Sequence, residues 1–76
     1  MNIAGVKASF VLTTYNKEVY VSARAIDEVN VQVMMEKMGG GGHMTVAGAQ
    51  FKDKTINNVI LELKETIDEM IVNDEL

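Results

Sequence analysis

The sequence predicts an α/β fold, in the form of a small two-layer domain whose sheet is covered by two helices. Two patterns carry this prediction: apolar residues alternate with polar ones in three segments and recur at helical spacing in two others. The expected order is strand, strand, helix, strand, helix, with the first two strands forming an antiparallel hairpin and the third joining a mixed sheet. A chain of 76 residues has room for a single domain with a single core.

The first half of the chain predicts the hairpin. The alternating apolar positions are Val6, Ala8, Phe10 and Leu12 in the first strand and Val19, Val21 and Ala23 in the second. The polar residues 15–18 between them predict a tight turn. Because successive side chains of a strand point to opposite faces, we expect Tyr20, Ser22 and Arg24 together on the face away from the core.

Two helices are expected to cover the sheet. Asn30 predicts the N-cap of a short helix over residues 31–38, and Gly39 then stands where a positive φ ends a helix. Thr55 predicts the cap of a longer helix that reaches about Val72. The two apolar stripes are Val31, Met34, Met35 and Met38 in the first helix and Ile56, Val59, Ile60, Leu63, Ile67, Met70 and Ile71 in the second.

The segment between the helices permits two interpretations. Residues 43–47 fit one helical turn closed by Gly48, or a strand that runs continuously through Val46 and Ala47. Residues 49–52 alternate like a strand in either case. Three strands leave open edges, so we expect a further strand or a partner, and pairing through an open edge would give a homodimer.

Composition excludes several classes of function. The formal net charge is −4, from seven Lys and Arg against eleven Asp and Glu, which disfavours long nucleic acids as partners. The sequence has no cysteine for a disulfide or thiolate site. It also has no apolar run long enough to span a membrane and no signal peptide, so a cytoplasmic chain without membrane contact is expected.

Four consecutive glycines, Gly39–Gly42, stand directly before His43. Gly39 is explained by the helix end, which leaves Gly40, Gly41 and Gly42 without a reason. If a helical turn begins at His43, the free N–H groups and the helix N-terminus form a site for a phosphate. His43 would donate to that phosphate or stack on a base. The alternative is a flexible connector.

Arg24 and Asn30 are the other candidate ligand contacts. The guanidinium of Arg24 can hold a phosphate with two hydrogen bonds, although an ion pair with Asp27 or Glu28 is an equally simple role. Asn30 is a helix cap first and a ligand contact second. With one histidine and no cysteine, no metal-ligand set and no catalytic constellation is found, so we expect no catalytic residue and no bound metal.

Several of these segments together resemble a known family: Ser22-Ala23-Arg24, Asn30-Val31-Gln32, Met35-Glu36-Lys37 and Gly39–His43 followed by Ala47-Gly48. The stretch SARAIDEVNVQVMMEKMGGGGHMTVAGAQ is similar to the DHH-associated C-terminal domain of DHH-family phosphoesterases, in particular cyclic-di-AMP phosphodiesterases of the GdpP (YybT) type. Ala25 and Asp27 depart from that pattern, in which serine and glycine are usual, and Asp27 would be able to neutralise Arg24.

The resemblance implies a division of labour. The chain would be one substrate-binding domain, residues 1–76, from the C-terminal part of a larger phosphodiesterase. An upstream DHH domain would hold two manganese ions, while this chain binds a cyclic or short linear dinucleotide. Arg24 would contact a phosphate, and Gly40, Gly41, Gly42 and His43 the nucleotide. The parent protein would be anchored in a membrane, with sensor and degenerate GGDEF domains.

Two alternatives stay open at this point. The chain could be a regulatory or oligomerisation module without any ligand, or the equivalent domain of a nanoRNase or a RecJ-like exonuclease. The sequence leaves open which dinucleotide is preferred.

Overall fold

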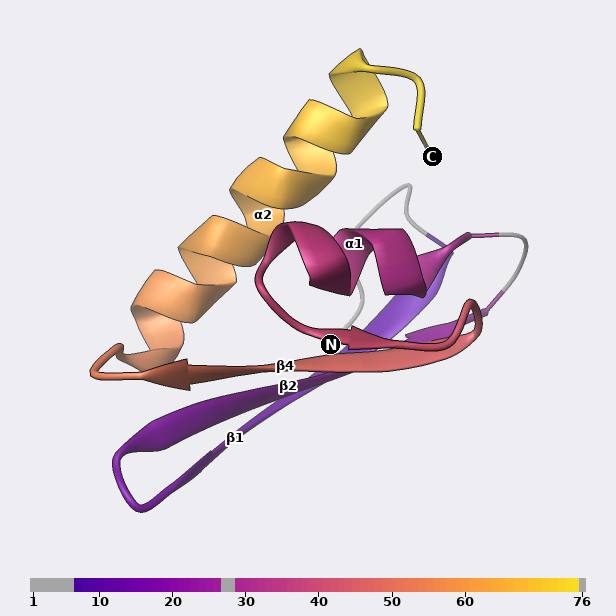
Figure 1. Cartoon of the computed structure of the whole chain (residues 1–76). Helices are drawn as coiled ribbons and strands as arrows, with labels where there is room; N and C mark the ends of the chain where they lie inside the picture. The colour runs from indigo at the N-terminus through magenta and orange to yellow at the C-terminus, as the bar shows by residue number, and fades with distance from the viewer. Residues whose placement is uncertain (1–6, 27–28, 76) are drawn as a thin grey trace.

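The computed structural model describes residues 7–26 and 29–75, which form one sheet and two helices. The elements are β1 (Ala8–Tyr15), β2 (Glu18–Ala25), α1 (Val31–Lys37), β3 (Gly41–Gly42), β4 (Val46–Lys52) and α2 (Ile56–Val72). Figure 1 shows both helices on the same side of the sheet. The two-layer α/β fold is therefore confirmed. The expected start of the first strand at Val6 lies outside the described residues.

The sheet has the strand order β1-β2-β4-β3, and every pair of neighbouring strands is antiparallel. The chain leaves β2, passes through α1 and returns as β3 in the direction of β2, as a crossover connection does. β4 then turns back and inserts between β2 and β3. The sheet is therefore antiparallel throughout the described strands, where a mixed sheet was expected.

A two-residue turn joins β1 to β2, with Tyr15 and Glu18 as the last pair of the hairpin. Asn16 and Lys17 both have positive φ, 51° and 63°. This is the backbone of a type I′ turn, whose twist matches that of the flanking strands. The predicted hairpin is confirmed, and Lys17 occupies a position that favours glycine.

The hydrophobic core lies between the sheet and the two helices. Its buried residues are Ala8, Phe10, Val19, Val21, Ala23, Ala47, Ala49 and Phe51 from the sheet, Val31, Met34, Met35 and Met38 from the segment of α1, and Val59, Leu63, Ile67 and Met70 from α2. The methionine stripe is thus core packing. Ile71 was expected in the apolar face of α2 but is 54% exposed, because Met70 takes the inward position in the last turn.

Both helices begin and end with side-chain or backbone caps. The Oδ1 of Asn30 accepts a hydrogen bond from the Val33 N–H at 3.2 Å, and the Oγ1 of Thr55 accepts one from the Asn58 N–H at 3.1 Å. At the end of α1, Gly39 has φ 89°, and Gly40 donates its N–H to the carbonyl of Met35 at 2.8 Å. This Schellman motif turns the chain out of the helix.

Residues 43–47 do not form a helical turn. His43 donates its N–H to the carbonyl of Val46 at 2.7 Å, and β4 begins at Val46. Met44 and Thr45 are then the loop of a second hairpin, β3 to β4. The strand interpretation of this segment is therefore confirmed, and the glycine run itself supplies the fourth strand. Neither described helix is long and apolar enough to cross a bilayer.

We predict that Lys17→Gly stabilises the protein by about 0.5–1 kcal/mol, because glycine adopts the left-handed backbone of the turn without steric cost. The midpoint of urea unfolding would rise. Thr13→Gly is the matched control at an exposed position within β1, and a loss of similar size is expected there. A lower midpoint for Lys17→Gly would contradict the assigned turn.

Candidate functional site

The glycine run does not form the anion site that a following helix would provide. Gly41 and Gly42 are the strand β3, and no helix begins at His43. The N–H groups of Gly39, Gly40 and His43 already donate to the carbonyls of Glu36, Met35 and Val46. The helical turn on which a phosphate site at a helix N-terminus depended is therefore absent, because Gly39 and Gly40 donate to the end of α1 and His43 donates to β4.

Two of the glycines are required by close packing of backbone on backbone. A Cβ on Gly40 would lie 2.1 Å from the carbonyl oxygen of Gly48, and one on Gly42 would lie 2.5 Å from the Cα of Ala47. Gly42 also has φ 141°. Any side chain at these positions would push the glycine run away from β4. Gly40 and Gly42 thus have a structural reason, which the sequence alone did not reveal.

Gly41 differs from its neighbours. A Cβ built on this residue would meet no atom within 4 Å, and its φ is outside the positive range. Gly41 pairs with Gly48, so both residues face the side of the sheet that the helices leave open. Within the described residues the fold does not require glycine here. The space beside the backbone of Gly41 is therefore open.

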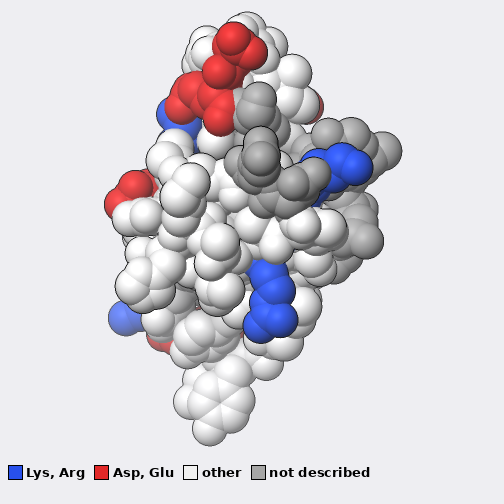
Figure 2. Space-filling model, turned by 90° about the vertical axis from the view of Figure 1, so that its right-hand side faces the viewer, with Lys and Arg blue, Asp and Glu red and all other residues white. Residues whose placement is uncertain are grey.

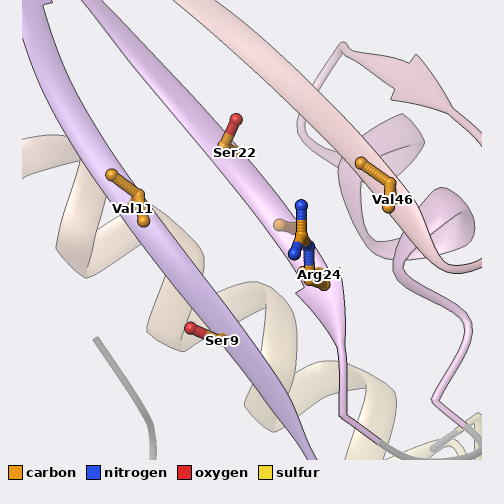
Figure 3. Close-up of a pocket in the computed structure, with 6 residues that line it drawn as sticks. Ser9, Val11, Ser22, Arg24 and Val46 are labelled. Carbon is orange, nitrogen blue, oxygen red and sulfur yellow. The ribbon is translucent and has the colours of Figure 1, made fainter.

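Arg24 lies on this open face of the sheet, near the end of β2. Figure 3 shows its side chain on β2, between Ser9 of β1 and Val46 of β4, with the helices behind the strands. These residues line a shallow hollow of about 460 Å³ together with Val11, Ser22 and Ala23. Arg24 is exposed and forms no ion pair with any residue that the structure describes. The alternative partners Asp27 and Glu28 lie outside the described residues.

A second hollow of about 430 Å³ adjoins the first, and the two share Ser22. Its lining comes from the glycine run and from the strands β2 and β4: Tyr20, Val21, Ser22, Gly39, Gly40, Gly48, Ala49 and Gln50. Three of these residues are glycines, so at these positions the surface is bare backbone. The two hollows together form a surface that runs from Arg24 to Gln50, which we call the open-face site.

Of the predicted site residues, Arg24 lines the first hollow and Gly40 the second, whereas neither hollow is lined by Asn30, Gly41, Gly42 or His43. His43 is exposed, and its N–H donates to the carbonyl of Val46. Val46 in turn pairs with Arg24, so the three residues lie in one row across the sheet. Two strand spacings separate His43 from Arg24, roughly 10 Å between their Cα atoms. Their long side chains can therefore reach one ligand on the open face. Asn30 is occupied as the cap of α1.

Glu18 organises the end of the site opposite Arg24. Its Oε2 accepts hydrogen bonds from the Tyr20 hydroxyl, at 2.7 Å, and from the Gln50 Nε2, and its Oε1 lies 3.9 Å from the Lys52 Nζ. The hydrogen bond from Tyr20 lowers the pKa of Glu18 from its ordinary value, and the hydrogen bond from Gln50 and the charge of Lys52 act in the same direction. The hydrogen bond to Glu18 raises the pKa of Tyr20 from its ordinary value.

The sequence pattern alone does not reveal this cluster. Glu18 and Tyr20 alternate with Ser22 and Arg24 on one strand, so half of it was visible in the pattern. Gln50 joins only through the register of β2 and β4, in which it stands opposite Tyr20. Glu18 and Gln50 are 32 positions apart, so only knowledge of how β2 and β4 pair would have brought them together.

Charge is unevenly distributed over the molecule. Figure 2 shows one face on which acidic atoms gather at the upper end, while the centre is mostly uncharged around a separate basic group. Among the residues that the structure describes, no three His, Cys, Asp or Glu side chains are grouped so that they could hold a metal ion.

The fold and the site define a small antiparallel α/β domain with an open, glycine-lined sheet face. The family model of the DHHA1 domain matches residues 1–73, and the chain belongs to this family.

Curated relatives support the assignment. The chain is 46% identical over 69 residues to the cyclic-di-AMP phosphodiesterase PdeA of Listeria monocytogenes, which covers 90% of this chain and 10% of that protein. It is 46% identical over 68 residues to the cyclic-di-AMP phosphodiesterase GdpP of Geobacillus thermodenitrificans, 88% of this chain and 10% of that protein. An A-adding tRNA nucleotidyltransferase of Geobacter sulfurreducens is 35% identical over 65 residues, 84% of this chain and 7% of that protein. The chain spans about a tenth of the length of the two phosphodiesterases.

We predict opposite effects for alanine at two neighbouring glycines. Gly40→Ala should lower the free energy of unfolding by about 1–3 kcal/mol, because its methyl group meets the backbone of Gly48 and Ala49. Gly41→Ala should leave stability unchanged or raise it by up to about 1 kcal/mol, because the methyl group enters open space. Urea unfolding of both variants measures this. Equal losses would show that Gly41 is also required by the fold.

A further prediction concerns the titration of Glu18. Because its pKa is lowered in the folded protein, Glu18 contributes stability that is present above its unfolded pKa and lost as pH falls through the folded value. Tyr20→Phe removes the first cause of the shift, so the pKa of Glu18 should move up toward 4.5. Carboxyl chemical shifts followed by NMR against pH give this value directly. An unchanged titration in Tyr20→Phe would contradict the hydrogen bond.

Proposed function

We propose that the open-face site binds the phosphate-bearing substrate of a cyclic-di-AMP phosphodiesterase of the GdpP type. The observation that carries the proposal is the combination of two residues on the same face: Gly41, which the fold does not require as glycine, and Arg24, which forms no ion pair with any described residue. Arginine recognises phosphate oxygens through two parallel N–H groups. Bare glycine backbone lets a flat or bulky ligand approach without a clash.

The roles of the candidate residues follow from their places. Arg24 holds a phosphate above Ser22, at the point where the two hollows meet. His43 approaches the same ligand from the edge strand, and Gly41 leaves room for it. Gly40 and Gly42 act indirectly, since they allow the glycine run to lie against β4. Asn30 contributes by capping α1, which ends at the glycine run.

Hydrolysis itself would belong to another domain. In the proposed parent protein a DHH domain holds manganese, which would polarise the phosphate and supply the attacking hydroxide. This chain would hold the substrate against that domain and face the cytoplasm from a membrane-anchored protein. The similarity to a tRNA nucleotidyltransferase supports a binding role. A phosphodiesterase and a nucleotidyltransferase are named for different reactions, so a segment similar in both suits binding better than one particular reaction.

Binding by the chain is tested with two variants. Arg24→Ala should weaken binding of cyclic-di-AMP by about 10- to 100-fold, as expected for the loss of a hydrogen bond between charged groups. His43→Ala should weaken it by roughly tenfold. Titration followed by NMR chemical shifts measures both. Lys64→Ala is the control, since Lys64 is an exposed cation on α2, away from the open face.

The result separates the alternatives. Shifts confined to residues of β2, β4 and the glycine run support the proposal. If cyclic-di-AMP, its linear product and short RNA all fail to shift these residues at millimolar concentration, the chain is a regulatory or oligomerisation module instead. Binding of short RNA alone would support the domain of a nanoRNase or a RecJ-like exonuclease.

A further inference from the structure

The hollow at the Glu18 end of the open face has a chemistry distinct from the end at Arg24. Along β2, Tyr20 is four residues from Arg24, roughly 13 Å at 3.3 Å per residue. Among the described residues, no Lys or Arg lines this second hollow. Its lining combines an aromatic ring, an amide and bare glycine backbone. Such a surface suits a flat, neutral, hydrogen-bonding group better than a phosphate.

We propose that this second hollow is a nucleobase subsite, which selects adenine over guanine through the amide of Gln50. The inference deepens the proposed function and rests on it, since the base belongs to the nucleotide whose phosphate Arg24 holds. Three features of the hollow carry the argument: its shape, its aromatic ring and the fixed orientation of its amide.

The floor and wall of the hollow fit a planar ring. Gly39, Gly40 and Gly48 leave the backbone uncovered, so a base can lie flat against it. Tyr20 is half-buried and stands opposite Gln50 in the register of β2 and β4. Its hydroxyl is held by Glu18, which fixes the ring at the border of the hollow. Aromatic rings at such sites stack on bases of any kind, so Tyr20 supplies affinity without selectivity.

Selectivity comes from the orientation of the Gln50 amide. Glu18 has a lowered pKa and is ionised at neutral pH, so its oxygens only accept hydrogen bonds. Gln50 must therefore turn its Nε2 toward Glu18, as the structure has it. The Oε1 of Gln50 and its second N–H then face away from the carboxylate and are available to a ligand.

This arrangement matches adenine and mismatches guanine. Adenine presents an N6 amino donor beside the N7 acceptor, the pair that a glutamine amide binds with two hydrogen bonds. Guanine presents two acceptors, O6 and N7, on the same edge. Its O6 would then meet the Oε1 of Gln50 without a proton between them. Glu18 is thus a positioning residue for base selection, which acts through Gln50 and does not touch the base.

The test compares AMP with GMP, and cyclic-di-AMP with cyclic-di-GMP, by NMR titration of the chain. We expect the adenine ligands to bind about tenfold more tightly. Gln50→Ala should abolish the preference. Glu18→Gln should reduce it toward unity, because a second amide lets Gln50 turn over. Tyr20→Phe should keep the preference, since the ring and the Glu18–Gln50 hydrogen bond remain.

Glu62→Gln is the matched control, because Glu62 is also an ion-paired carboxylate, 2.7 Å from Lys54, but lies on α2. It should change neither affinity nor preference. Dispersed amide spectra establish that each variant is folded. Binding without an adenine preference, or a preference that survives both Gln50→Ala and Glu18→Gln, overturns the subsite while leaving the phosphate site in place. Absence of binding by every nucleotide overturns the proposed function as well.

Discussion

The close approach of the glycine run to β4 is the constraint on which the rest of this domain depends. With 2.1 Å between a notional Cβ of Gly40 and the carbonyl of Gly48, no side chain fits between the end of α1 and the sheet. That contact lets α1 end in a Schellman motif directly above β4 and lets Gly41 and Gly42 pair as β3. It also brings Gly39 and Gly40 to the border of the second hollow. One packing requirement therefore shapes both the helix layer and the candidate site.

The open face of the sheet shows how a small domain can separate stability from recognition. The core side of β2 carries Val19, Val21 and Ala23, which are buried, while the other side carries Glu18, Tyr20, Ser22 and Arg24. Because the pleat alternates strictly, substitutions on the open face leave the core contacts intact. The structure thus permits the ligand surface to vary without repacking, whereas the glycines at its border are fixed by backbone contact.

The sequence predicted the elements whose buried residues recur with a regular spacing. The hairpin, the methionine stripe of α1 and the long α2 were all predicted, because alternation and helical spacing report which face is buried. For the segment after the four glycines, the sequence left a helical turn and a strand equally open. Glycine carries no periodic signal, and its requirement at Gly40 arises from Gly48, eight positions away and on another strand. The Glu18–Gln50 contact was missed for the same reason, since only strand register brings the two residues together.

The glycine-histidine segment is not a loop with free backbone N–H groups at Gly39, Gly40 and His43. A loop of free N–H groups would bind an anion through the backbone, yet the N–H groups of Gly39, Gly40 and His43 already have intramolecular partners. The segment instead leaves open space beside the backbone of Gly41. It also places the imidazole of His43 directly after the edge strand β3, in register with Val46 and Arg24. In the proposed function, the guanidinium of Arg24 supplies the charge that binds a phosphate, and side chains such as Gln50 discriminate among ligands. On that proposal, the ligand is recognised by the side chains of the sheet face, and the glycine run leaves the backbone beside them uncovered.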